Sequence, residues 1–133
     1  MLKVENLKVY YPSAQRLFAP RRFVRAVDGV SFELGRAQTL GLVGESGCGK
    51  TTLGRAILGL SPVTEGSIFF EGQNIASLSG SKLRRHRRKI QMIFQDPYGS
   101  LDPLMTIEQI LGEPLDIHRL YSNRSERREK ILS

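Results

Sequence analysis

The sequence has little cysteine, few acidic residues and no long apolar run. Cys48 is the only cysteine among the 133 residues, so a disulfide within the chain and a metal site built from cysteines are both excluded. No apolar stretch approaches the roughly 20 residues of a membrane-spanning helix, and the first residues lack the apolar core of a secretory signal. We therefore expect a cytoplasmic protein, or one attached to the cytoplasmic side of another structure.

The shortage of acidic residues is concentrated in residues 82–89. The chain has 20 Lys and Arg against 13 Asp and Glu, a formal net charge of +7, and 40% apolar residues, enough for the core of one ordinary domain. A basic run without acids suits nucleic acid, anionic lipid or simply a solvated helix face, and composition does not choose among them. The cations of this run are Lys82, Arg84, Arg85, Arg87, Arg88 and Lys89.

The most informative stretch is a glycine-rich loop at residues 44–51. Its sequence, Gly-Glu-Ser-Gly-Cys-Gly-Lys-Thr, fits the phosphate-binding pattern G-x-x-x-x-G-K-[ST] at every required position. The apolar run 39–43 before it predicts a buried strand. Residues 53–60 after it carry apolar side chains at the i, i+3, i+4, i+7 spacing of an amphipathic helix. Strand, loop and helix in this order predict a nucleotide phosphate site rather than an ordinary glycine turn.

Each residue type in this loop has a physical reason. Glycine permits backbone conformations that turn successive N–H groups toward an anion, and the following helix adds unpaired N–H groups and the positive end of its dipole. We expect Lys50 to reach the β- and γ-phosphates and the Thr51 hydroxyl to bind Mg²⁺. The predicted nucleotide-binding residues of this stretch are Gly44, Glu45, Ser46, Gly47, Cys48, Gly49, Lys50, Thr51 and Thr52.

Alternating apolar and polar residues predict strands before the loop. Residues 1–9 are expected to form a first strand that ends at the Tyr-Tyr-Pro sequence, followed by a polar surface loop over 13–22. Residues 23–27 and 30–34 are expected to form two paired strands, because Asp28-Gly29 between them is a typical hairpin turn.

The remainder of the chain predicts a mixture of short helices and strands. Turns are expected at Ser61-Pro62 and Glu65-Gly66, and a basic helix is expected to begin with Ser79 or Ser81 as its cap. The other expected elements are a hairpin of 67–70 with 73–75, a central apolar strand at 90–94, a loop at 95–103, a helix at 105–111 capped by Thr106, and a last helix capped by Asn123.

Four stretches together resemble the N-terminal half of an ABC-transporter ATP-binding subunit of the oligopeptide, dipeptide and nickel importer branch. They are Asn-Leu-Lys-Val-Tyr-Tyr-Pro at 6–12, Ala-Val-Asp-Gly-Val-Ser-Phe at 26–32, the phosphate loop with its two preceding residues at 42–51, and 91–103. The last is the most specific, because in this branch an aspartate-proline and a leucine-x-proline sequence follow the Q-loop. The resemblance covers nearly all 133 residues.

The resemblance implies an α/β fold of the P-loop NTPase class. It implies a RecA-like core with an antiparallel β subdomain over 1–95, and the start of a helical subdomain over 96–133. Gln95 resembles the Q-loop glutamine, which implies a second Mg²⁺ ligand beside Thr51 and the start of the segment that meets the membrane subunit. Tyr11 resembles the aromatic residue that stacks on adenine, with Tyr10 as the alternative. ATP and Mg²⁺ are the implied ligands.

Later motifs of the family do not occur in the sequence. After Gln95 there is no LSGGQ-like signature, no apolar strand that ends in Asp-Glu, and no switch histidine in a matching context. We therefore expect a partial domain that binds nucleotide without hydrolysing it alone, since no general base is available. The resemblance implies an energy-coupling subunit of a peptide-type importer, with permease subunits and a second ATP-binding subunit as partners, at the cytoplasmic face of the membrane.

Two other functions are compatible with parts of the sequence. A truncated, non-hydrolysing module that docks on transporter subunits would carry the same motifs. A soluble P-loop kinase, a GTPase or a DNA-acting ABC ATPase would also need the phosphate loop, but the chain has no guanine-binding Asn-Lys-x-Asp sequence. Nucleic acid is not an expected partner, and salt-sensitive DNA binding would revive that interpretation.

Overall fold

A computed structural model describes residues 1–13, 22–96 and 99–133. The chain divides into two compact units, an N-terminal unit Met1–Ile90 and a C-terminal unit Gln91–Ser133. Each is described separately. In the described part of the chain, no helix is long and apolar enough to cross a membrane. The predicted surface loop at 13–22 lies almost wholly outside the described residues.

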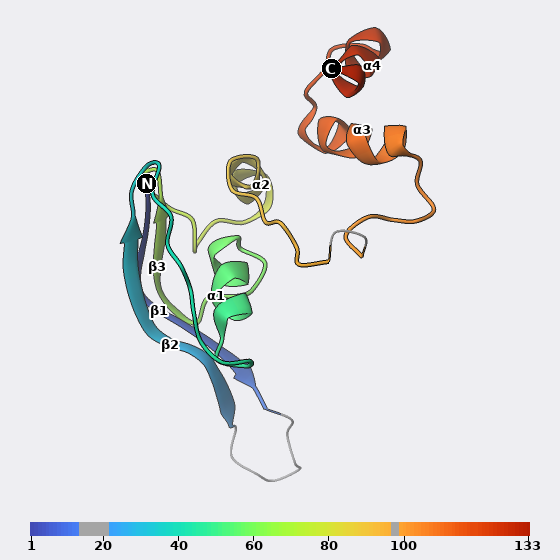
Figure 1. The fold of residues 1–133 in the computed structure, drawn as a ribbon. Coiled ribbons are helices and arrows are strands. Elements are labelled where there is room, and N and C mark those ends of the chain that lie inside the picture. Colours follow the sequence, from blue (N-terminus) through green and yellow to red (C-terminus); the bar gives the residue numbers. More distant parts are fainter. Residues whose placement is uncertain (14–21, 97–98) are drawn as a thin grey trace. The chain divides into compact units, whose positions relative to one another are not determined.

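The N-terminal unit is a four-stranded antiparallel sheet with one helix packed on its inner face (Figure 1). The strand order is β2-β1-β3-β4, so β1 lies between β2 and β3. The elements are β1 (Leu2–Pro12), β2 (Phe23–Leu34), α1 (Lys50–Ile57), β3 (Glu65–Phe70), β4 (Gln73–Asn74) and α2 (Gly80–Arg87).

The core of this unit lies between the sheet and α1. In β1 the buried residues are Val4, Leu7 and Val9, and in β3 the buried residue is Ile68, as expected for strands with one covered face. Helix α1 adds two side chains of its apolar stripe, so the amphipathic pattern predicted for this helix is confirmed, although the helix spans 50–57 rather than 53–60. The buried core consists of Val4, Leu7, Val9, Val27, Leu53, Ala56, Ile68 and Ile75.

The predicted hairpin at Asp28-Gly29 is wrong. Strand β2 runs without a turn through both residues and pairs with β1 along its whole length. The register shifts at this point, because Leu7 pairs with Val30 but Val9 pairs with Val27. Gly29 has φ +75°, a left-handed conformation that suits a bulge as well as a turn. Strand β1 was predicted to end at Val9, but through the same bulged pairing with β2 it continues to Pro12.

Two other predicted strands are absent. Residues 39–43 and 90–94 are irregular, and several of their apolar side chains are exposed, Val43 by 91% and Ile93 by 96%. An apolar run becomes a strand only when another segment supplies hydrogen-bonding partners. Among the described residues, no strand pairs with either segment.

The short hairpin after α1 is confirmed, with β3 and β4 joined at Glu71-Gly72. Glu65 and Gly66, predicted as a turn, are instead the first residues of β3. The basic helix is also confirmed as α2. Ser79 is its N-cap residue by backbone conformation, but its side chain makes no capping hydrogen bond.

The C-terminal unit contains α3 (Ile107–His118) and α4 (Arg124–Leu132). Both begin as predicted. Thr106 and Gln109 form a reciprocal capping box at α3, and Asn123 accepts a hydrogen bond from the Glu126 amide at α4. Helix α3 is longer than the predicted 105–111. Arg127 joins the two helices by a bidentate pair with Asp116, at 2.8 and 2.9 Å.

The interactions of Glu126 make the stability of this unit depend on pH. Its carboxylate accepts from Lys130 Nζ at 2.7 Å and from the Ser122 amide at 2.7 Å, and these bonds lower its pKa from 4.5 to about 2. Stabilisation by the ionised form is complete above pH 4.5 and is lost as the pH falls toward about 2. We expect Glu126→Gln to lower the thermal midpoint of unfolding at neutral pH and to have no effect below pH 2.

Far-UV circular dichroism at several pH values measures this effect. Glu129→Gln is the matched control on the same helix, because Glu129 is exposed and makes no ion pair among the described residues. A Glu126→Gln effect that persists unchanged in acid would contradict the assignment.

Candidate functional site

The glycine-rich loop passes directly into α1. Gly44, Gly47 and Gly49 have φ values of +153°, +83° and +97°, a region that residues with a Cβ atom rarely adopt. Helix α1 starts at Lys50, with Gly49 as its N-cap. The loop therefore has the backbone conformation that its glycines predict, at the amino end of a helix.

Two of these glycines also lie where a side chain would collide. A Cβ atom on Gly49 would lie 2.1 Å from the carbonyl oxygen of Ala26 in β2. A Cβ atom on Gly44 would lie 2.6 Å from Cys48 Sγ. A Cβ atom on Gly47, by contrast, would have no atom within 4 Å outside its chain neighbours. Gly49 thus fixes the loop against the sheet, and Gly47 leaves open space above it.

Lys50 lies over the loop. Its ammonium group donates hydrogen bonds to the carbonyl oxygens of Gly44 at 2.6 Å and Glu45 at 2.7 Å, and it is 3.4 Å from Cys48 Sγ. Both carbonyl oxygens face the Lys50 side chain, which lies along the loop. The positive charge is therefore held at the loop, within reach of any anion that the loop amides bind.

The first turn of α1 has no competing group of its own. Gly49 provides no side-chain cap, and the first turn contains no acidic residue. The first N–H groups of a helix need partners, and together with the helix dipole they favour an anion at this end. Thr51 is exposed in this turn, so its hydroxyl is accessible.

A cavity of about 340 Å³ lies beside the loop. Cys48, Gly49 and Lys50 form its loop side. Arg25 and Asp28 of β2 also line this cavity, and neither was predicted as a site residue. Their position depends on the β-bulge in β2, which the alternation of apolar and polar residues does not reveal. The Asp28-Gly29 pair was the only sign of this bulge in the sequence, and it was assigned to a hairpin turn instead.

Tyr10 holds these two charged residues in place. Its hydroxyl donates to Asp28 Oδ1 at 2.5 Å, Arg25 Nη1 donates to Asp28 Oδ2 at 3.3 Å, and the Arg25 guanidinium lies 5.6 Å from the centre of the Tyr10 ring. The hydrogen bond from Tyr10 lowers the pKa of Asp28, and the same bond raises the pKa of Tyr10. Asp28 is therefore ionised and engaged on both oxygens.

Tyr11 faces the other side of β1. Its ring packs against the hydrophobic core, and its hydroxyl donates to Ser61 Oγ at 3.2 Å. The choice between Tyr11 and Tyr10 as the adenine-stacking residue stays a prediction. Gln95 is exposed and belongs to the C-terminal unit, so its proposed role beside the phosphate loop also stays a prediction.

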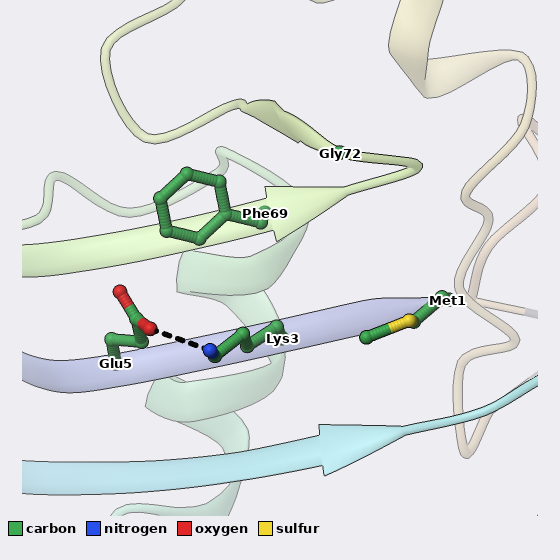
Figure 2. A pocket seen from close by; sticks show the side chains of 5 residues that line it. All are labelled: Met1, Lys3, Glu5, Phe69 and Gly72. Carbon is green, nitrogen blue, oxygen red and sulfur yellow. Dashed lines mark ion pairs between the residues drawn. The ribbon is translucent and has the colours of Figure 1, made fainter.

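A second cavity, of about 280 Å³, lies on the sheet face opposite the core (Figure 2). Figure 2 shows the side chains of Lys3, Glu5 and Phe69 on adjacent strands, with Lys3 directed at Glu5. Lys3 pairs with Glu5 at 2.9 Å and with Glu33 at 3.1 Å, and these two pairs raise its pKa. The charged groups of this cavity already pair with one another, whereas the glycine loop lies at the amino end of α1, which has no side-chain cap and no acidic residue in its first turn. We therefore take the loop as the functional site.

Comparisons with known proteins agree with this geometry. Residues 27–133 match the ABC transporter family. The chain is 50% identical over 133 residues to the oligopeptide transport ATP-binding protein AppF of Bacillus subtilis, with 98% of this chain and 40% of that protein covered. It is 47% identical over 133 residues to the dipeptide transport ATP-binding protein DppF of Escherichia coli, with 100% of this chain and 40% of that protein covered. The chain thus spans about 40% of the length of these relatives.

The fold is similar to that of a solved ATP-binding cassette. A dimeric post-hydrolysis structure of the cassette MJ0796, bound to ADP and Pi, matches with a TM-score of 0.79 and 27% sequence identity. The match covers 99% of this chain and 54% of that cassette. The predicted P-loop NTPase fold class is therefore confirmed, with the antiparallel sheet as the described β subdomain.

Proposed function

Because the chain belongs to the ABC transporter family, as its motifs predicted, we propose that it is the nucleotide-binding part of an energy-coupling importer subunit. The transported solutes are peptides or similar small molecules. The relatives named above are ATP-binding proteins of oligopeptide and dipeptide transport, which supports this solute class.

The phosphate loop is the observation that carries the proposal. Its glycines adopt conformations and close contacts that a Cβ atom would prevent. Lys50 holds an ammonium group at the loop, on the carbonyl oxygens of Gly44 and Glu45. Helix α1 begins at the same end of the loop without a side-chain cap, and the first N–H groups of a helix have no partner within the helix. This is the donor set that a triphosphate requires, since amides, an ammonium group and a helix dipole all favour negative charge.

The same residues fit ATP with Mg²⁺. Residues 44–52 bind the phosphates, and the Thr51 hydroxyl and the Gln95 amide oxygen are the protein ligands of Mg²⁺, an ion that prefers oxygen ligands and is shared with substrate phosphates. When bound, Mg²⁺ neutralises phosphate charge. Tyr11 stacks on the adenine base. Residues 1–95 form the nucleotide-binding core, and 96–133 begin the segment that contacts the permease.

The proposed setting is the cytoplasmic face of a membrane. There the subunit docks on transmembrane permease subunits and pairs with a second ATP-binding subunit. The chain alone is proposed to bind nucleotide without turnover, because none of its residues matches the family's general base. A positioned base is needed to orient the attacking water in this type of phosphoryl transfer.

Lys50→Ala tests the proposed function. Removing the ammonium group from a phosphate contact costs about 1.5–3 kcal/mol, so we expect Mg·ATP affinity to fall roughly tenfold to a hundredfold. Isothermal titration calorimetry with the purified chain measures the change. Lys82→Ala is the matched control, because Lys82 is exposed on α2 and makes no ion pair among the described residues. Equal Mg·ATP affinity in both variants would overturn the phosphate-loop assignment.

A further inference from the structure

Among the described residues of the N-terminal unit, the contacts of helix α2 with the rest of the unit lie along one side of the helix. Arg87 donates through Nη2 to the carbonyl oxygen of Gly59 at 2.8 Å and through Nε to that of Leu58 at 3.4 Å. These carbonyls follow the last turn of α1, where partial negative charge accumulates and a cation is favourable. Leu83 packs beside Gly59, where an added Cβ atom would lie 3.0 Å from Leu83 Cδ1.

His86 and Lys89 complete the attachment. The His86 Nε2 atom lies 3.0 Å from Gln73 Oε1, and its ring meets Phe70 edge to face with centroids 6.4 Å apart. Just beyond the helix, Lys89 Nζ pairs with Glu71 at 2.5 Å. Two of the six cations in the basic run, Arg87 and Lys89, therefore serve the fold.

The other four cations lie on the opposite side of the helix. At about 100° per residue, positions 82, 84, 85 and 88 fall within an arc of roughly 160°, and positions 83, 86 and 87 fall on the other side. All four side chains are exposed, and none forms an ion pair or a hydrogen bond with the described residues. The basic face consists of Lys82, Arg84, Arg85 and Arg88.

We propose that this basic face binds the surface of a membrane that contains anionic phospholipid. Four unpaired cations on one side of a fixed helix carry charge that nothing in the described fold compensates. Clustered Lys and Arg side chains gain attraction to anionic headgroups when they lie within about a Debye length of the surface, roughly 10 Å at 0.1 M salt. The proposal rests on the proposed function, because that function brings the chain to a membrane.

The composition of the basic face favours lipid over nucleic acid. Single-stranded nucleic acids are bound by grooves that combine cations with aromatic side chains for base stacking, and sequence readout of duplexes adds the amide side chains of Asn or Gln among the cations. Among residues 80–88, the same arc holds the four cations and Ser81, with no Asn, Gln or aromatic side chain, and the aromatic neighbour Phe70 lies on the attached side, against His86. A cationic surface without amide or aromatic side chains to read or stack on bases suits a layer of anionic headgroups.

Vesicle co-sedimentation tests the proposal with the purified chain. We expect binding to vesicles of mixed phosphatidylglycerol and phosphatidylcholine at low salt, weaker binding at high salt, and none to phosphatidylcholine alone. Replacing all four cations of the basic face with glutamine should weaken binding roughly a hundredfold or more. The matched control replaces Arg22, Arg36, Arg124 and Arg128 with glutamine, which removes the same charge from exposed positions elsewhere.

The outcomes separate the possibilities. Retained vesicle binding in the control and loss in the basic-face variant support the proposal. Equal loss in both variants, or loss in neither, overturns it, as does a preference for a DNA duplex over the anionic vesicles. Mg·ATP binding, measured in parallel, should be unchanged in the basic-face variant. A chain that binds vesicles through the basic face but not Mg·ATP would refute the proposed function and leave the basic face standing.

Discussion

Gly49→Ala is expected to destabilise the chain by about 2–5 kcal/mol and to remove measurable Mg·ATP binding. The left-handed conformation of Gly49, φ +97°, costs a residue with a Cβ atom roughly 1–2 kcal/mol. The new methyl group would also lie 2.1 Å from the Ala26 carbonyl oxygen. That contact is with backbone, so the sheet and the loop must separate, at about 1–3 kcal/mol for an overpacked site.

The loss of Mg·ATP affinity should be larger than the loss of folding stability alone would cause. Moving the loop from β2 shifts the amides at the start of α1, and two lost hydrogen bonds to charged phosphate lower affinity at least about a hundredfold. Gly47→Ala is the matched control for stability, because Gly47 has φ +83° but no atom within 4 Å of an added Cβ. It should cost only about 1–2 kcal/mol of conformational strain. Denaturant unfolding that ranks the two variants equally would contradict the close contact with Ala26.

Gly66→Ala is expected to have an effect of similar size, about 2–5 kcal/mol, but on the sheet rather than the site. Gly66 has φ +93°, and an added Cβ atom would lie 2.4 Å from the Asn6 carbonyl oxygen and 2.6 Å from that of Glu5. Asn6 is itself in a left-handed conformation, φ +44°, at a bulge of β1. Its displaced amide donates to Ser31 Oγ at 2.8 Å.

The bulge thus brings backbone so close to β3 that only glycine fits. A typical domain has a free energy of unfolding of about 5–15 kcal/mol, so this substitution would remove a large part of it. Gly72→Ala is the control in the same sheet, with φ +82° and no neighbour within 4 Å of an added Cβ. Urea unfolding of both variants measures the difference, and a Gly66→Ala cost no larger than that of Gly72→Ala would show that β1 and β3 can separate freely.

Sequence patterns predicted the parts of the fold that depend on local interactions. The presence of a helix next to the phosphate loop, the β3–β4 hairpin, the caps of α3 and α4, and the basic helix all follow from residues close together in the chain. Capping and turn formation are local, so the residues that cause them can be recognised without knowing the rest of the structure.

The errors arose where the outcome depends on distant segments. Residues 39–43 and 90–94 have the composition of buried strands, but pairing requires a partner strand that composition cannot supply. Asp28-Gly29 has the same backbone preference in a turn and in a bulge, and only the pairing of β2 with β1 decides between them. For the same reason the backbone conformation of the glycine loop was predictable, whereas the position of Arg25 and Asp28 beside it was not.

Both ends of helix α1 contact a functional element of the chain. The phosphate loop leads directly into its first turn, and the Gly59 carbonyl oxygen just beyond its last turn accepts a hydrogen bond from Arg87 of α2. The eight residues of α1 span only about 12 Å, so the phosphate loop and the contact with Arg87 lie at the two ends of one short helix. If the loop binds phosphate as proposed, a tilt of α1 on binding would also move α2 through Arg87, and would change the orientation of the basic face.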